Sequence, residues 1–381
     1  MNRQMIPNRL RARLLKNIAR LLLRLLDKQV LKGMPADMTE HEVIDMCLLL
    51  TDIVPNDTPV VDIRADTPII IVGDTYAQYG HLVRIFNCYG HPPEMRYMLL
   101  GNYLSQKQNT LETIILLFAY KALYPKSIYL LRGKHECARM GKYCGFYDEC
   151  LKRFSRRIWN AITSVFCLLP VIGIINDKVF CVHSGLSPMF KQFDVRGIEQ
   201  LKNFVKKNIT FPANYSSNRL LTHFVWSDPD ESIDEWDQNP CGLGYLYGKN
   251  VVNDFCQRFN ISQIVRSSEM VKAGFEFFPS PKLLTIFSAP DYMDTYANKA
   301  SVMLLMKGLT GGLISQLKVI SPIIRLRCKQ TLRMNITLEE VFVHLGHGVF
   351  EEGEEIPECF PLPDKNEGNC EKGTSKGSYR V

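Results

Sequence analysis

Four short apolar runs, each closed by polar residues, constrain the fold of this chain more than any other feature of its sequence. They are PIIIVGD (68–74), YMLLGN (97–102), IYLLRGKH (128–135) and KVFCVHS (178–184). Short apolar runs bounded by turn residues are typical of buried strands. Two segments of helical character, YGHLVRIFNCYG and TLETIILLFAYKALYP, separate the first three runs. The pattern predicts a βαβαβ unit with Asp74, Asn102 and His135 at one edge of its sheet.

The following segments predict a further helix and a second sheet. Residues 146–166 carry an apolar side chain at every third or fourth position, which predicts one helix. Beyond residue 178 the runs GFEFF, KLLTIFSAP and ASVMLLM are short and rich in branched or aromatic residues, as strands are. A second sheet stacked on the first would give an α/β sandwich flanked by helices.

The N-terminal segment is strongly basic. Its first 26 residues hold seven basic residues and no acidic one, and the leucines from Leu10 to Leu25 recur at helical spacing. A basic amphipathic helix can lie on an anionic membrane or serve as a transit peptide. It can also pack on its own domain with a solvated basic face, and this is the interpretation we favour.

Composition and segment boundaries narrow the class of protein. The chain is 46% apolar and 22% charged, and no apolar run approaches the roughly 18 residues of a membrane span. The twelve cysteines show no paired CxxC spacing and follow no secretory signal, so we expect reduced thiols, without disulfides or zinc, in the cytoplasm or nucleus. We divide the chain into a basic N-terminal extension (1–19), one domain (20–322) and a tail (323–381). The tail contains the acidic cluster EEGEE, and we expect its last part to be disordered.

Asp, Asn and His at converging strand ends suggest a particular chemistry. Such residues bind divalent metal ions that hydrolyse phosphoesters, and basic groups nearby hold the phosphoryl group. By spacing alone the signal is weak, because an Asp at a strand end often caps the next helix.

Longer stretches give a more specific indication. GDTYAQYGHLVRIF, LLRGKHECARM, GFYDEC, VFCVHSGLSP, WSDPD and LTIFSAPDY occur in this order. Together, residues 20–320 resemble the catalytic domain of the phosphoprotein phosphatase family, closest to type 1 serine/threonine phosphatases. The resemblance implies a metallophosphoesterase-type β-sandwich flanked by helices, with two Mn or Fe ions per chain in active members.

The resemblance also exposes a degenerate metal site. The family binds two metal ions with two aspartates, an asparagine and three histidines. Asp74 and His183 match two of these ligands, and Asn102 could still offer a carbonyl oxygen. Four of the six positions have changed, to Tyr76, Asn102, Lys134 and Ser268. Protonated Lys134 has no lone pair, and Tyr76 would have to lose a proton with a pKa of about 10 to act as a ligand. We therefore expect no native dinuclear centre and no cofactor at full occupancy.

The catalytic residues implied by the resemblance are equally depleted. His135 matches the general acid and Tyr292 is retained. Ser105 stands where an aspartate orients the acid, and Gln106 and Cys241 stand where two arginines clamp the phosphate. Bidentate arginine contacts are the strong part of phosphate recognition, and neither substitute can supply one. The surviving residues could also persist only as hydrogen-bonded parts of a folded site.

Lys134 has a candidate role in this emptied pocket. A site built for metal cations would leave Asp74 uncompensated, so Lys134 could pair with Asp74. The alternative is an outward, solvated ammonium.

Three functions remain open. The first is a pseudophosphatase, whose phosphatase fold binds regulatory or scaffold proteins through an apolar groove. The positions matching the family's groove could equally be sheet core, and Gln263 departs from the family's leucine; the groove positions are Phe277, Leu284, Ile286, Met303, Leu309 and Leu313.

The second function is an active phosphoprotein phosphatase with a rebuilt centre, in which Asp74, Asn102, His183 and His135 hold one ion with help from Glu269 or Asp228. The third is a phosphopeptide reader that uses Lys134, His135 and Tyr292, and the loss of both arginines disfavours it. We expect neither nucleic-acid nor membrane partners.

Overall fold

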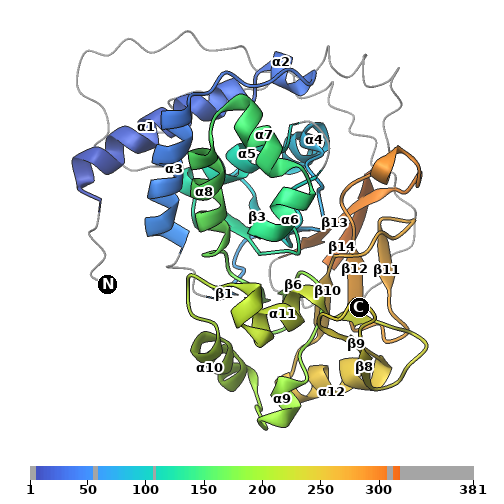
Figure 1. Cartoon of the computed structure of the whole chain (residues 1–381). Helices are drawn as coiled ribbons and strands as arrows, with labels where there is room; N and C mark the ends of the chain where they lie inside the picture. The colour runs from blue at the N-terminus through green and yellow to red at the C-terminus, as the bar shows by residue number, and fades with distance from the viewer. Residues whose placement is uncertain (1–5, 55–58, 106–108, 307–311, 318–381) are drawn as a thin grey trace.

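The computed structural model of the chain describes residues 6–54, 59–105, 109–306 and 312–317 (Figure 1). The predicted tail, 323–381, and two positions of the site and groove predictions, Gln106 and Leu309, lie outside these residues.

A five-stranded sheet contains the predicted βαβαβ unit. Its strand order is β14-β13-β2-β3-β4, and β2, β3 and β4 run parallel. Helix α4 connects β2 to β3, and helix α5 connects β3 to β4, as the sequence predicts. The elements are β2 (Ile69–Val72), α4 (Tyr79–Tyr89), β3 (Arg96–Leu99), α5 (Thr110–Leu123), β4 (Ile128–Leu130), β13 (Ala300–Leu305) and β14 (Gly312–Leu317).

A six-stranded sheet of order β1-β5-β6-β10-β12-β11 stacks on the first. Buried side chains from both sheets, among them Ile71, Met98, Val265 and Ile286, form one apolar layer between them. The predicted two-sheet sandwich is therefore confirmed. The strands of the second sheet are β1 (Val60–Ile63), β5 (Ile172–Ile175), β6 (Val179–Val182), β10 (Gln263–Arg266), β11 (Phe275–Phe277) and β12 (Leu283–Ile286).

Helices cover the outer face of each sheet (Figure 1). One core cluster joins the five-stranded sheet to the helices α1 (Asn8–Leu25), α3 (Glu40–Ile53), α4, α5, α7 (Phe146–Arg153) and α8 (Arg156–Phe166). Another joins the six-stranded sheet to α9 (Met189–Gln192), α10 (Ile198–Asn208), α11 (Arg219–Trp226) and α12 (Lys249–Phe259). The other described elements are the short helices α2 (Lys28–Leu31) and α6 (Ala138–Tyr143), the 3-10 helices η2 (Tyr215–Ser217) and η3 (Tyr292–Asp294), and a small sheet of β7 (Asp228–Pro229), β8 (Trp236–Gln238) and β9 (Tyr245–Tyr247).

The basic N-terminal helix is part of this domain. The apolar face of α1, including Leu14, Ile18 and Leu22, is buried in the core cluster with α3 and α5. Arg11 Nη1 lies 3.2 Å from Asp52 Oδ2 on α3. The packing interpretation is thus confirmed, and α1 runs without a break through the boundary drawn after residue 19. Among the described residues, no helix combines the length and apolar character needed to cross a bilayer.

Three expectations about local structure were wrong. The predicted helix 146–166 is two helices, because the Ser155 side chain accepts a hydrogen bond from Arg157 N–H and caps α8. Beyond residue 178, where the sequence pattern predicts strands, the chain also forms the helices α9 to α12. Cys88 is disulfide-bonded, whereas eight other described cysteines are free thiols.

Buried histidines should make the fold sensitive to acid. Burial lowers the pKa of His91 and of His223 to about 4, while an unfolded histidine binds its proton near pH 6.5. Between these values the unfolded chain binds more protons than the folded chain, so the free energy of unfolding falls as the pH falls from 6.5 to 4. Each histidine should contribute on the order of 3 kcal/mol across that interval.

Urea denaturation at pH 7 and pH 4.5 measures this loss. His223→Gln should reduce the difference between the two pH values, and the matched change at exposed His41 should leave it as in the wild-type chain. Equal pH dependence in all three proteins would contradict the assignment.

Candidate functional site

The strand ends of both sheets meet at one site. Asp74 follows β2, Asn102 follows β3, and His183 follows β6. Asn102 Nδ2 donates to Asp74 Oδ2 at 2.8 Å, and His183 Nδ1 lies 3.6 Å from Asp74 Oδ1. The backbone N–H of His135, after β4, donates to Asn102 Oδ1 at 3.1 Å, and that of Ser268, after β10, donates to Asp74 Oδ1 at 3.3 Å. The structure therefore brings together the strand-end residues that the sequence places at one edge.

Two glycines allow the loops after β3 and β4 to touch. A Cβ added at Gly101 would lie 2.6 Å from Gly133 Cα, and one added at Gly133 would lie 2.5 Å from Asn102 N. Real Cβ atoms do not approach so closely, so side chains are excluded from both positions. This contact sets the spacing between Asn102 and His135.

Several site residues have a strained backbone. The φ angles of Tyr76, Asn102 and Ser268 are 44°, 53° and 74°. Positive φ is uncommon outside glycine and is an outlier for a bulky side chain such as tyrosine. Such strain is usually retained at functional sites. Three of the four substituted metal positions thus keep a strained backbone.

The amide of Asn102 presents its donor side to the site. The backbone N–H of His135 can only donate, so Asn102 Oδ1 must face it. The Asn102 NH₂ group then points to Asp74 and to Tyr76 Oη, the latter at 3.2 Å. Asn102 in this orientation offers no lone pair between the strand ends, whereas the predicted role as a metal ligand requires one.

Tyr76 occupies much of the remaining space. Its ring lies 4.5 Å from that of Tyr292, 5.3 Å from His135 and 5.7 Å from Phe287, centroid to centroid. Burial, reinforced by the nearby Asp74 charge, raises the pKa of Tyr76 well above its usual value. The phenol therefore stays neutral and is a poor metal ligand.

Lys134 pairs with a different carboxylate from the one predicted. Its Nζ lies 3.3 Å from Asp228 Oδ2, on β7, and 5.4 Å from the centre of the Trp226 ring. The predicted Lys134–Asp74 salt bridge is therefore wrong as a contact, although the Lys134 charge still favours the ionised form of Asp74. Burial is the larger effect and raises the pKa of Asp74, despite hydrogen bonds from Ser267, Asn102 and Ser268.

Arg266 completes a charge network that sequence reasoning missed. Its side chain is fully buried, and its Nη2 donates to Asp228 Oδ1 at 2.6 Å while its Nη1 donates to Glu269. Burial alone would raise the pKa of Asp228, but the charges of Arg266 and Lys134 outweigh it and the pKa is lowered. An arginine inside the buried strand QIVR was the available signal in the sequence.

His135 is held as a neutral imidazole. Its Nδ1 donates to the Leu104 carbonyl at 2.9 Å, and Cys144 Sγ lies 3.6 Å from the same nitrogen. Burial, reinforced by the charge of Lys134, lowers its pKa. A general acid must carry a proton on the nitrogen that faces the leaving group. In the neutral form that donates through Nδ1, the other nitrogen carries none.

His183 keeps one free lone pair. Its Nδ1 donates to the Leu100 carbonyl at 2.8 Å, so Nε2 is the acceptor, and this buried atom has no hydrogen-bond partner among the described residues. Burial and the charge of Lys134 lower the pKa of His183 well below its usual value. This is the tautomer of a metal-binding histidine.

Of the other predicted catalytic positions, those that the structure describes supply no cation for a phosphate clamp. Cys241 is exposed in the loop between β8 and β9, and its Sγ donates to the Leu243 carbonyl at 3.3 Å. Tyr292 packs on Tyr76, and Ser105 lies at the start of the loop that leads to α5. Glu136 has a structural role instead, because its carboxylate accepts the backbone N–H groups of Asn102, Tyr103 and Gly133.

Three of the six predicted docking-groove positions are core. Leu284, Ile286 and Met303 are at most 2% exposed and belong to the apolar layer between the sheets. Phe277 is half-buried on β11, the edge strand of the six-stranded sheet. Leu313 lies on β14. The alternative interpretation, that these positions are sheet core, is therefore correct for Leu284, Ile286 and Met303.

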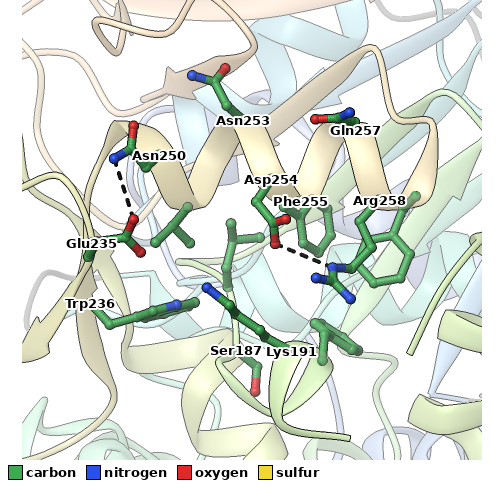
Figure 2. Close-up of a pocket in the computed structure, with 14 residues that line it drawn as sticks. Ser187, Lys191, Glu235, Trp236, Asn250, Asn253, Asp254, Phe255, Gln257 and Arg258 are labelled. Carbon is green, nitrogen blue, oxygen red and sulfur yellow. Dashed lines mark hydrogen bonds and ion pairs between the residues drawn. The ribbon is translucent and has the colours of Figure 1, made fainter. Parts of the chain in front are cut away.

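A cavity of about 350 Å³ lies away from this site, between α9, α12 and β8 (Figure 2). Lys191, Trp236, Asp254 and Arg258 are among its lining residues, and none of the strand-end residues lines it. Asp254 Oδ2 and Arg258 Nε are 3.3 Å apart, so two of its charges compensate each other.

Comparison with known proteins agrees with the fold. Residues 67–267, more than half of the chain, match the model of the calcineurin-like phosphoesterase family. The chain belongs to this family of metallophosphoesterases.

A solved structure shows the same fold. A protein serine/threonine phosphatase from Saccharomyces cerevisiae, described as similar to human phosphatase PP5, superposes with a TM-score of 0.68 at 24% identity, covering 77% of this chain and 93% of that chain. A cold-active protein-tyrosine phosphatase of a psychrophilic Shewanella species gives 0.47 at 15% identity, covering 68% and 82%. At 24% identity, the likeness to the Saccharomyces cerevisiae phosphatase is one of fold.

The residues present do not fit the pair of metal ions that the family implies. Both carboxylate oxygens of Asp74 accept hydrogen bonds from the protein, Asn102 presents donors, and Lys134 adds a cation. Among the described strand-end residues, two imidazole nitrogens keep a lone pair of the ligand type: His183 Nε2, which is buried without a hydrogen-bond partner, and the unprotonated Nε2 of His135. Two such nitrogens are too few for a pair of ions. Across the described residues, no group of three or more His, Cys, Asp and Glu side chains is arranged to hold a metal.

Proposed function

We propose that this protein is a pseudophosphatase, a phosphatase fold that binds regulatory or scaffold proteins and does not hydrolyse phosphoesters. The proposal rests on the hydrogen bonds and ion pairs at the strand ends. Asn102 donates a hydrogen bond to Asp74, and Lys134 and Arg266 both pair with Asp228. Protein groups therefore compensate the carboxylates at the strand ends, as metal ions would otherwise do.

Catalysis by this site would lack three separate contributions. The donor set supplies too few lone pairs for a metal pair to activate water. Neutral His135 holds its proton on the nitrogen that faces Leu104. No arginine stands at position 241 to bind the phosphoryl group bidentately. Each loss alone would lower turnover, and together they support a protein without catalytic activity.

Hydrolysis assays test the proposal directly. The purified full chain is assayed with an aryl phosphate and with phosphoserine and phosphothreonine peptides, in Mn²⁺ and in Fe²⁺, beside an active member of the family. We expect rates equal to the protein-free blank. Turnover that is lost in Asp74→Asn would overturn the proposal, because activity would then depend on the site described above.

The free lone pair of His183 favours a second candidate, an active phosphoserine or phosphothreonine protein phosphatase with a single metal ion. Among the described residues, His183 Nε2, His135 Nε2 and Asp74 offer ligand chemistry, and water would have to fill the remaining positions. Titration with Mn²⁺ separates the two candidates. One ion bound per wild-type chain, and none in His183→Ala, would support the second candidate.

The proposed protein partners could dock along β11. An edge strand offers its backbone to an extended partner segment, and half-buried Phe275 and Phe277 would flank it. Phe277→Asp should sharply reduce the amount of partner that copurifies with tagged full chain, while the fold is kept. Tyr143→Asp, which charges an exposed aromatic residue on α6, is the matched control. Equal recovery with both variants would place the interface elsewhere.

A further inference from the structure

The solvent side of α1 carries a basic stripe. Arg9, Arg13 and Arg20 recur at intervals of four and seven residues, which places them on one side of the helix. All three are exposed, and no ion pair joins them to a carboxylate in the part of the chain that the structure describes. The other arginines of this helix differ, because Arg11 pairs with Asp52 and Arg24 with Glu42.

An apolar cavity opens beside this stripe. It has a volume of about 480 Å³ between α1 and α3, and it is lined by Leu10, Leu48, Leu168 and Arg13, among others. Leu10 is 40% exposed and Leu48 is 55% exposed, so apolar surface reaches solvent here. Asp45 and Asp52 also line it, which limits how much negative charge can enter the cavity itself. The surface fits a segment with an apolar residue followed by several acidic ones.

The C-terminal tail contains such a segment. Residues 339–371 hold ten carboxylates and one lysine, a net charge of −9, against +7 for the first 26 residues. Within this stretch, VFEEGEE (349–355) places Val349 and Phe350 directly before four glutamates. The order of apolar and acidic residues matches the cavity and the stripe.

We propose that residues 349–355 dock in cis on α1 and α3, with Phe350 in the cavity and the glutamates along Arg9, Arg13 and Arg20. The linker permits this. The 33 residues from the end of β14 to Phe350 span about 30 Å as a flexible coil and up to roughly 110 Å when extended. Tethering gives an effective concentration of the order of mM, so weak contacts suffice.

An anionic membrane is the alternative binding partner for the basic stripe on α1. A helix that lies on a bilayer inserts its apolar face among the lipids. The apolar face of α1 is instead buried against α3 and α5, and Asp45 and Asp52 flank the cavity. These features favour a peptide over a lipid surface.

Charge reversal in the full chain tests the docking. Arg9→Glu, Arg13→Glu and Arg20→Glu together should release the tail and raise the rate of chymotrypsin cleavage within 339–371 about tenfold, as expected for the loss of several exposed ion pairs. The tail sequence is unchanged in this comparison. The matched control reverses Lys152, Arg156 and Arg157, which are exposed on α7 and α8, and should cleave like the wild-type chain.

The complementary exchange completes the experiment. Changing Glu351, Glu352, Glu354 and Glu355 to lysine should also release the tail. Adding the three α1 reversals to that variant should lower the cleavage rate again, since opposite charges then face each other. Equal cleavage in all variants would overturn the proposal. Wild-type binding to phosphatidylserine vesicles at physiological salt, unchanged by the tail reversal, would also overturn it, because α1 would then be open to lipid.

Discussion

Asp228→Asn is expected to lower the free energy of unfolding by roughly 3–5 kcal/mol, the usual cost of removing one partner of a buried ion pair. Asp228 lies between the buried guanidinium of Arg266 and the Lys134 ammonium, at 2.6 and 3.3 Å. With a neutral amide in place of the Asp228 carboxylate, Arg266 would keep Glu269 as its one ion-pair partner among the described residues, and Lys134 would lose its carboxylate partner. Urea denaturation at pH 7 measures the change.

A control and a second variant make the result specific. Asp234→Asn removes an exposed carboxylate from the loop between β7 and β8 and should change stability by less than about 0.5 kcal/mol. Adding Lys134→Met to Asp228→Asn should recover part of the loss, because one unpaired cation is removed. A loss as small as that of Asp234→Asn would show that the network does not stabilise the strand ends.

Stepwise restoration of the family's residues should produce the largest change in activity. Four substitutions rebuild the ligand set on a backbone that already brings the strand ends together: Tyr76→His, Asn102→Asp, Lys134→Asn and Ser268→His. We expect this variant to bind two divalent ions and to hydrolyse an aryl phosphate slowly. Poor turnover follows because the residues that orient His135 and clamp the phosphate are still missing.

Three further substitutions should then raise turnover at least about 100-fold, because groups preorganised for the transferring phosphoryl are usually the largest catalytic term. They are Ser105→Asp, Gln106→Arg and Cys241→Arg. Lys134→Asn alone is the control and should gain neither metal nor activity, since it removes a repulsion without adding the missing ligands. Wild-type turnover equal to that of the sevenfold variant would contradict the assignment of these positions.

The sequence predicts the parts of this fold that local patterns encode. The apolar runs before Asp74, Asn102 and His135 identify β2, β3 and β4, because fully buried parallel strands are continuously apolar. Because such strands are apolar at every position, their sequence does not show which face of the sheet a given residue lies on. Leu284 on β12 and Met303 on β13 belong to strands that are apolar on both faces, so the pattern cannot distinguish a surface groove from the layer between the sheets.

The partner of Lys134 could not be predicted for a related reason. Asp228 is 94 residues further along the chain, and only the path from α11 into β7 brings it beside the loop after β4. The identity of each residue at the site follows from the sequence, whereas the direction of a long flexible side chain depends on which carboxylate lies nearest. The break before α8 is different, since Ser155 is a capping residue that an unbroken apolar period obscures.

The metal content of the purified chain shows most directly whether the strand-end site holds ions. The purified full chain is dialysed against Mn²⁺ or Fe²⁺, freed of unbound ions and measured by elemental analysis, with the fourfold restored variant as the positive control. The site described here predicts no stoichiometric metal in the wild-type chain and two ions per chain in the variant. Two ions per wild-type chain, together with hydrolysis of an aryl phosphate, would contradict the proposed pseudophosphatase function.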